Sequence, residues 1–185
     1  MSLATVTERL AKIAVLQRGV HPSFADGVCV MEAVAYVCGE PFSDHPACVC
    51  PVITAFMSSW NDDLPDDHER TRLLAPLILR IIGSRSTPAV EQLRADLAFG
   101  WFAQHATALA PGMSLATMLA QPWDITLQAA WSAAWVVAWS EARSAAAKIS
   151  WETAVANAAV ADGGGLTVAA LQLSALDLVD RMLAL

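Results

Sequence analysis

Apolar residues recur at helical spacing through nearly every long segment of this 185-residue chain. Positions three and four residues apart share one face of a helix, and residues 4–18 show the pattern with Val6, Leu10, Ile13 and Ala14. No segment alternates apolar and polar residues between hairpin signals, as strands do. The spacing therefore predicts an all-α fold.

Glycine, proline and capping residues divide the chain into seven to nine expected helices. Pro76 lies inside an apolar helical stretch and should kink or split it, because proline cannot donate the helical hydrogen bond. Gly39 and Gly83 are natural helix ends. The expected helices are 4–18, 27–38 with Ser23 or Asp26 as its N-cap, 46–60 with Asp44 or His45 as its N-cap, 65–82, 87–110, 114–121, 124–161 and 167–185.

The chain has the length of one domain, which we expect to be compact and to span residues 1–185. Its composition suggests two sub-halves. Residues 1–86 form an acidic helical module, and residues 87–185 form an Ala/Trp-rich helical bundle that contains one long helix.

The hydrophobic content of 56% and the mean hydropathy of +0.45 raise the question of a membrane span. The longest stretch without a charged side chain covers residues 97–123, and it is interrupted by Gln104, His105 and Pro111-Gly112. The remaining pieces are too short to cross about 30 Å of hydrocarbon. We read no signal peptide either. We therefore expect a cytoplasmic protein that buries surplus apolar surface against a partner or a second copy of itself.

The net charge of −7 is unevenly distributed. Between Arg18 and Arg70 there is no lysine or arginine, whereas nine acidic residues occur there. An acidic chain lacks the basic surface that nucleic-acid binding requires. We expect the arginines of residues 70–85 to pair with neighbouring acids. The acidic region 21–69 is expected to meet a protein partner, with Asp62, Asp63, Asp66 and Asp67 as interaction residues.

Three tryptophans, Trp131, Trp135 and Trp139, recur every four residues in the longest helical pattern. Four residues advance a helix by about 400°, so the three indoles form a slowly drifting ridge with alanines between them. Such a ridge is typical of a helix–helix interface, although an aromatic ligand box has the same spacing. The pattern leaves open whether the interface lies within one chain or between two copies.

The four cysteines follow the spacing Cys29-x8-Cys38-x9-Cys48-x-Cys50, with His45 three positions before Cys48. Structural zinc sites usually contain two pairs of closely spaced ligands, and only one such group is present here. We interpret the cysteines as core residues and expect no cofactor. If a metal were bound, the ligands would be His45 and Cys48 of the H-x2-C-x-C group, completed by Cys29 or Cys38 from the preceding helix, with His45, Cys48 and Cys29 as the main candidates. A reactive thiol at Cys48 is the other alternative.

Glu32 lies among apolar residues in GVCVMEAVAYVCG, so we expect its carboxylate to be at least partly buried. Its expected donors are groups of the SDHP turn, residues 43–46, or an arginine from residues 70–85. A buried carboxylate is either a structural hydrogen-bond hub or a catalytic acid or base. Cys29, Glu32 and His45 could form a catalytic cluster with Cys29 as nucleophile and His45 as base. The favoured interpretation is a polar pin that fixes the turn between two helices.

The stretch CVMEAVAYVCGEPFSDHPACVCPVITAFMSSWNDDLP, followed by LILRIIGSRS, resembles a module found in small uncharacterised proteins of actinobacteria and their phages. The helix AAWSAAWVVAWSEARSAAA and the tail LQLSALDLVDRMLAL are similar to the second half of those Ala/Trp-rich helical proteins. The resemblance implies organisation and no particular reaction. The positions that carry it are Cys29, Met31, Glu32, Gly39, Glu40, Ser43, Asp44, His45, Pro46, Cys48, Pro51, Asn61 and Asp62.

Two functional hypotheses follow from the sequence. The first is a non-enzymatic protein-interaction module that acts through its acidic face and self-associates, as a homodimer for example. If the chain is phage-encoded, the resemblance implies a host or defence protein as partner. The second hypothesis is a small enzyme or metal-binding protein that uses Cys29, Glu32 and His45.

Overall fold

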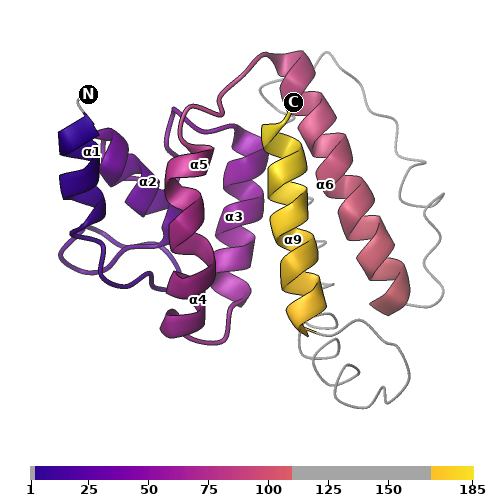
Figure 1. The fold of residues 1–185 in the computed structure, drawn as a ribbon, viewed down its shortest axis with the longest axis horizontal. Coiled ribbons are helices and arrows are strands. Elements are labelled where there is room, and N and C mark those ends of the chain that lie inside the picture. Colours follow the sequence, from indigo (N-terminus) through magenta and orange to yellow (C-terminus); the bar gives the residue numbers. More distant parts are fainter. Residues whose placement is uncertain (1–2, 110–167) are drawn as a thin grey trace. The chain divides into compact units, whose positions relative to one another are not determined.

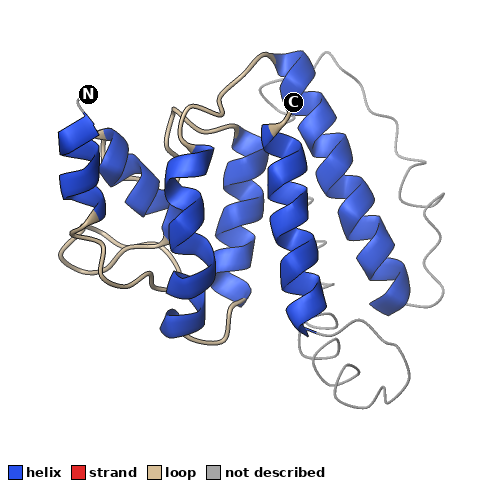
Figure 2. Ribbon diagram, viewed as in Figure 1, coloured by secondary structure: helices blue, strands red, loops and turns tan. Residues whose placement is uncertain are grey.

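The computed structural model describes residues 3–109 and 168–185, which form helices joined by turns and loops (Figure 1). These residues contain no β-strand, so the all-α prediction is confirmed for this part of the chain (Figure 2). The expected helices at 114–121 and 124–161, with Trp131, Trp135 and Trp139, lie outside the described residues. The total of seven to nine helices therefore stays a prediction.

Two compact units divide the chain, one formed by Met1–Ala95 with Leu185 and the other by Asp96–Ala184. The first unit contains most of the described helices, and α6 begins in it and continues into the second. In chain order the helices are α1 (Leu3–Leu10), α2 (Val30–Cys38), α3 (Pro51–Asp63), α4 (Asp67–Leu74), the 3-10 helix η1 (Ala75–Leu77), α5 (Ile78–Ile81), α6 (Pro88–Leu109) and α9 (Val168–Leu183). Among these residues, no helix is both long and apolar enough to span a membrane.

Helix α2 is the centre of the first unit. It contacts α1, α3 and α5, and a helix with neighbours on several sides is expected to be apolar all round. Its buried apolar side chains are Val30, Met31, Ala33, Val34, Ala35 and Val37. Glu32 is the one charged residue of this helix, and it is buried as predicted.

Pro76 splits its helix as predicted. The α-helical hydrogen bonding of α4 ends at Leu74, and a 3-10 turn over Ala75–Leu77 leads into the short helix α5. Gly83, with φ of 78°, then adopts the left-handed conformation that ends this helical stretch.

The first helix is shorter than predicted, because α1 ends at Leu10 although the apolar spacing continues to about residue 18. Beyond it the backbone finds partners elsewhere in the fold. The Leu16 N–H donates to Thr71 Oγ1 at 2.9 Å, and the Gln17 N–H donates to the Val28 carbonyl at 2.8 Å. Leu16 is fully buried in this position, so tertiary packing prevails over local helix propensity.

The N-cap of α2 is Cys29, so the prediction that Ser23 or Asp26 caps this helix is wrong. The Ser23 hydroxyl instead donates to Asp26 Oδ2 at 2.7 Å. Cys29 and Glu32 form a capping box, in which each side chain accepts from the backbone N–H of the other residue. The predicted end at Gly39 is confirmed by its left-handed φ of 73°.

Helix α3 begins at Pro51, five residues later than the predicted start at Pro46. The reason is the side chain of Glu40, which accepts hydrogen bonds from the N–H groups of Ala47 and Cys48. These bonds hold residues 40–50 as a loop, since a carboxylate outside the helix takes the place of helical carbonyls as acceptor.

In the second unit, α9 carries an apolar stripe at helical spacing, which agrees with the predicted final helix. Trp101 of α6 donates its indole N–H to Ser174 Oγ of α9 at 2.8 Å, so these two helices contact each other. The buried stripe consists of Leu171, Ala175, Leu178, Val179 and Met182.

Candidate functional site

Glu32, the one charged residue of α2, is fully buried, with 0% of its surface exposed. Its carboxylate accepts three hydrogen bonds. The donors are the His21 backbone N–H at 2.6 Å, His21 Nδ1 at 2.8 Å and the Cys29 backbone N–H at 2.8 Å. Three donors on one carboxylate offset much of the cost of removing its charge from water.

The histidine that meets Glu32 is therefore His21 and not His45. The His45 side chain is 70% exposed, and its Nδ1 lies 2.7 Å from Asp44 Oδ1, so neither residue caps a helix. The reason is topological, because the loop after α2 leaves the C-terminal end of the helix whereas Glu32 lies in its first turn. Of the predicted cluster of Cys29, Glu32 and His45, the structure brings together only Cys29 and Glu32. The prediction that Glu32 accepts from the 43–46 turn or from an arginine of residues 70–85 is likewise wrong, because its donors are His21 and Cys29.

Cys29 serves as a cap and is poorly suited to be a nucleophile. Its Sγ accepts the Glu32 N–H at 3.5 Å, and the side chain is buried. Burial raises the pKa of the Cys29 thiol to about 12, and the nearby Glu32 charge acts in the same direction. A nucleophilic cysteine reacts as the thiolate, which this environment disfavours.

Asn61 extends the hydrogen-bond network around Glu32. It is fully buried, its Oδ1 accepts the Val30 N–H at 3.2 Å, and its Nδ2 donates to the Gln17 carbonyl at 3.0 Å. Beside it, Asp62 Oδ1 accepts the Gly19 N–H at 3.0 Å. The loop of residues 11–29 is thus attached to α2 and to the end of α3.

The other predicted interaction acids have structural roles as well. Asp66 is the N-cap of α4 and accepts the Glu69 N–H at 2.8 Å. Asp67 pairs with Arg70, a buried arginine whose guanidinium also donates to the carbonyls of Asn61 and Leu64. Asp63 is the last residue of α3 and is partly buried. The expected pairing of arginines with nearby acids is confirmed for Arg70–Asp67, Arg72–Glu69 and Arg85–Glu91.

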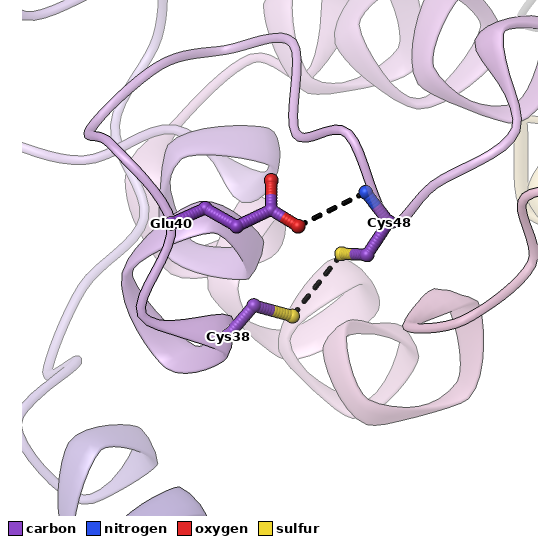
Figure 3. A group of neighbouring side chains, drawn as sticks. All are labelled: Cys38, Glu40 and Cys48. Carbon is purple, nitrogen blue, oxygen red and sulfur yellow. Dashed lines mark hydrogen bonds between the residues drawn. The ribbon is translucent and has the colours of Figure 1, made fainter. Parts of the chain in front are cut away.

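A second cluster lies after the C-terminal end of α2, where Cys38, Glu40 and Cys48 face one another (Figure 3). The two Sγ atoms are 3.1 Å apart. Glu40 accepts the Cys48 N–H through Oε1 at 3.0 Å and the Ala47 N–H through Oε2 at 2.6 Å. One thiol sulfur from each cysteine and one carboxylate oxygen all lie within 4.8 Å of one another, and the three side chains are partly buried.

The surroundings raise the pKa of both thiols in this cluster. Burial, hydrogen bonds with Cys38 and Glu40, and the negative charge of Glu40 raise the pKa of Cys48 to about 12. Burial also raises the pKa of Cys38, and the Glu40 charge adds to this, whereas the hydrogen bond with Cys48 and the charge of Arg9 lower it. A positive ion at the centre of the cluster would lower the pKa of both thiols and so oppose the effect of Glu40.

The cluster differs from the predicted set of metal ligands. Cys48 belongs to both, and Cys38 was the alternative to Cys29 as the ligand from the preceding helix. His45 and Cys29 do not lie in the cluster, and Glu40 was not expected there. The spacing C-x-E-x7-C carried a weak signal. Only the turn at Gly39 and the loop that follows bring these residues together.

Comparisons with protein-family models, curated proteins and solved structures gave no match to this chain. The resemblance to the actinobacterial and phage proteins stays a prediction. The candidate site is therefore defined by its geometry alone.

Proposed function

We propose that the chain is a non-enzymatic protein-interaction module that binds a protein partner through the loop of residues 11–29. The observation that carries this proposal is the length of the loop together with its attachment. Loops longer than about 12–15 residues without their own helices or strands are uncommon in compact domains, and the ordered ones are usually functional. Binding residues are often found on such loops when a rigid scaffold positions them.

The attachment comes from several elements at once. Leu16, Gly19 and His21 donate backbone N–H groups to side chains of α4, α3 and α2, respectively. In addition, the Gln17 carbonyl accepts from Asn61 of α3. A loop held in this way loses little conformational entropy when it binds, which favours affinity.

The loop presents apolar side chains to solvent. Val15 is 47% exposed and Val20 is 68% exposed. The anchored residues Leu16, Gln17 and Gly19 lie between the two valines in sequence, and His21 follows Val20 directly. Asp62, which holds Gly19, places a carboxylate beside the same segment. Arg18, which is exposed, lies between the two valines in sequence, so charges of both signs surround them. We infer that the partner offers an apolar contact for the valines with polar groups around it. Val15 and Val20 lie outside the acidic region 21–69, whose role in partner binding stays a separate prediction.

The predicted organisation of the whole chain belongs to the same proposal. We propose one all-α domain of seven to nine helices in the cytoplasm, which self-associates. The ridge of Trp131, Trp135 and Trp139 stays a predicted helix–helix interface, either within one chain or between two copies. The enzyme hypothesis has less support, because Cys29 is a buried cap with a raised pKa and His45 is paired with Asp44.

The proposal is tested with a photo-crosslinking amino acid placed at Val20 in the source cells. Leu79 of α5, which is 48% exposed, is the matched control position. We expect a saturable adduct from position 20 and none from position 79. The double variant Val15→Ser and Val20→Ser should bind the purified partner at least about tenfold more weakly with an unchanged unfolding temperature.

Equal crosslinking from both positions would contradict the proposal, as would unchanged affinity of the double variant. An adduct with the mass of two chains would identify the partner as a second copy. An activity that survives the double variant and is lost in His21→Asn would favour the enzyme hypothesis instead.

A further inference from the structure

We propose that Cys38, Glu40 and Cys48 form a binding site for a thiophilic divalent cation, with Zn²⁺ as the reference ion. The proposal is independent of the role of the 11–29 loop. It rests on three donor atoms, two sulfurs and one carboxylate oxygen, that lie within 4.8 Å of one another. Thiolate and carboxylate are both common zinc ligands, and sites with three protein ligands keep a fourth position for water or another molecule.

The distances fit this coordination after a small movement. Two sulfurs bound to a tetrahedral zinc at about 2.3 Å are about 3.8 Å apart. The Sγ atoms of Cys38 and Cys48 are 3.1 Å apart, so they would separate by about 0.7 Å. Cys38 is the last residue of α2 and Cys48 lies in a loop, and side-chain rotation at such positions can provide this movement (Figure 3).

The carboxylate of Glu40 is already oriented toward the thiols. Its two oxygens accept the N–H groups of Ala47 and Cys48, which fixes the plane of the carboxylate. Each carboxylate oxygen has a second lone pair that remains suitable for a metal ion. Hydrogen bonds that orient a ligand in this way are typical of the surroundings of metal sites.

The charges also favour a cation at this position. Two thiolates and one carboxylate carry three negative charges, and Arg9, which interacts electrostatically with Cys38, contributes one positive charge. A divalent ion completes neutralisation of the group. A redox-active dithiol would be served poorly by the same carboxylate, because Glu40 raises the pKa of both thiols and so disfavours the thiolate that thiol–disulfide exchange needs.

The test uses the 185-residue chain with its thiols kept reduced by a phosphine, titrated with Zn²⁺ in competition with a chromophoric chelator. We expect one ion per chain at this site. The variants Cys38→Ala and Cys48→Ala should bind Zn²⁺ at least about 100-fold more weakly, and Glu40→Gln about tenfold more weakly. Cys29→Ser, which keeps a hydrogen-bond acceptor at the N-cap of α2, should bind like wild type.

Two further measurements keep the test decisive if an alanine variant folds poorly. With Co²⁺ in place of Zn²⁺, the protein should show the visible bands of tetrahedral cobalt and a thiolate charge-transfer band, and Glu40→Gln should alter the visible bands. Calorimetry in buffers of different ionisation enthalpy should report about two protons released per ion, because each cysteine must lose its thiol proton to bind the metal.

The proposal is overturned if the reduced protein binds no Zn²⁺ at micromolar concentration. It is also overturned if the double variant of Cys38 and Cys48 retains wild-type affinity, or if the cobalt spectrum lacks thiolate bands. Loss of binding in Cys29→Ser with retention in Cys48→Ala would assign the metal to a different set of ligands.

Discussion

Glu32 and Glu40 lie at opposite ends of α2, and each fixes a loop with its carboxylate. Each accepts a backbone N–H from a cysteine, Cys29 or Cys48, and a second backbone N–H from the loop that it holds. They differ in what else they face. Glu32 also accepts a hydrogen bond from the imidazole of His21, whereas Glu40 faces two thiols.

This difference distinguishes a carboxylate that anchors a loop, Glu32, from one that lies in a candidate metal site, Glu40. Both carboxylate oxygens of Glu32 accept hydrogen bonds, and the carboxylate is fully buried. Around Glu40 a carboxylate and two sulfurs converge, and all three are groups that can ligate a cation. The same local device therefore stabilises the fold in the first case and assembles ligand atoms in the second.

The largest expected effect is that of Glu32→Gln, which should lower the free energy of unfolding by about 3 kcal/mol. Glutamine replaces one acceptor oxygen by an NH2 group, which then faces one of the donors from His21 or Cys29. The measurement is urea unfolding followed by far-UV circular dichroism. The matched control is Glu8→Gln, which removes an exposed pair with Lys12 and should leave stability nearly unchanged, because solvent screens an exposed ion pair. A loss below about 1 kcal/mol in Glu32→Gln would contradict the role of Glu32 as an anchor.

The second effect concerns Cys29 at alkaline pH. Its pKa is raised to about 12 from an ordinary value of 9.0, so between these pH values the folded protein keeps a proton that the unfolded chain has lost. Stability from this thiol is fully present below pH 9 and falls by about 1.4 kcal/mol per pH unit above it. Cys29→Ser should remove this contribution and so give a shallower decline.

The experiment is urea unfolding of wild type and Cys29→Ser at pH 8, 9 and 10. Contributions from other titratable groups are common to both proteins and cancel in the comparison. The difference in stability should be constant up to pH 9 and then shift in favour of the variant. Parallel declines would show that the Cys29 thiol titrates near its ordinary pKa in the folded protein.

The sequence predicted the helical class, the burial of Glu32, the stop at Gly39 and the split at Pro76. These follow from local rules, because apolar spacing, glycine at a helix end and the missing N–H of proline act within a few residues. The partner of Glu32 did not follow from such rules. His21 reaches it only because the chain leaves the helix after Leu10, and that departure depends on a long-range bond to Thr71.

The candidate metal site was missed for a related reason. Cys38 and Cys48 are separated by a loop whose path is set by backbone N–H groups that donate to Glu40, so the spacing of the two cysteines along the chain gave no measure of the distance between their sulfurs. Cys29 was misjudged as a candidate ligand and nucleophile because cysteine is seldom an N-cap. The fold uses its thiol in the position where serine or aspartate is usual.

The smallest expected effect is that of Glu40→Gln in the metal-free protein, which should cost about 1 kcal/mol. Its carbonyl can still accept one of the two N–H groups from Ala47 and Cys48, and this loop is partly exposed, so water can satisfy the other. The loss of negative charge should also lower the pKa of Cys48. Alkylation of Cys48 at pH 8 should therefore be faster in the variant.

The contrast between the two glutamates depends on this last result. If Glu40→Gln costs as much as Glu32→Gln, both carboxylates are anchors, and the thiols beside Glu40 are incidental neighbours. If instead the cost is small and Cys48 reacts faster, Glu40 acts chiefly on the thiols. Mass spectrometry of the alkylated peptides separates Cys48 from Cys29, which should stay unreactive in both proteins because it is buried. That comparison isolates the charge of Glu40 from any general loosening of the fold, since loosening would expose both cysteines together.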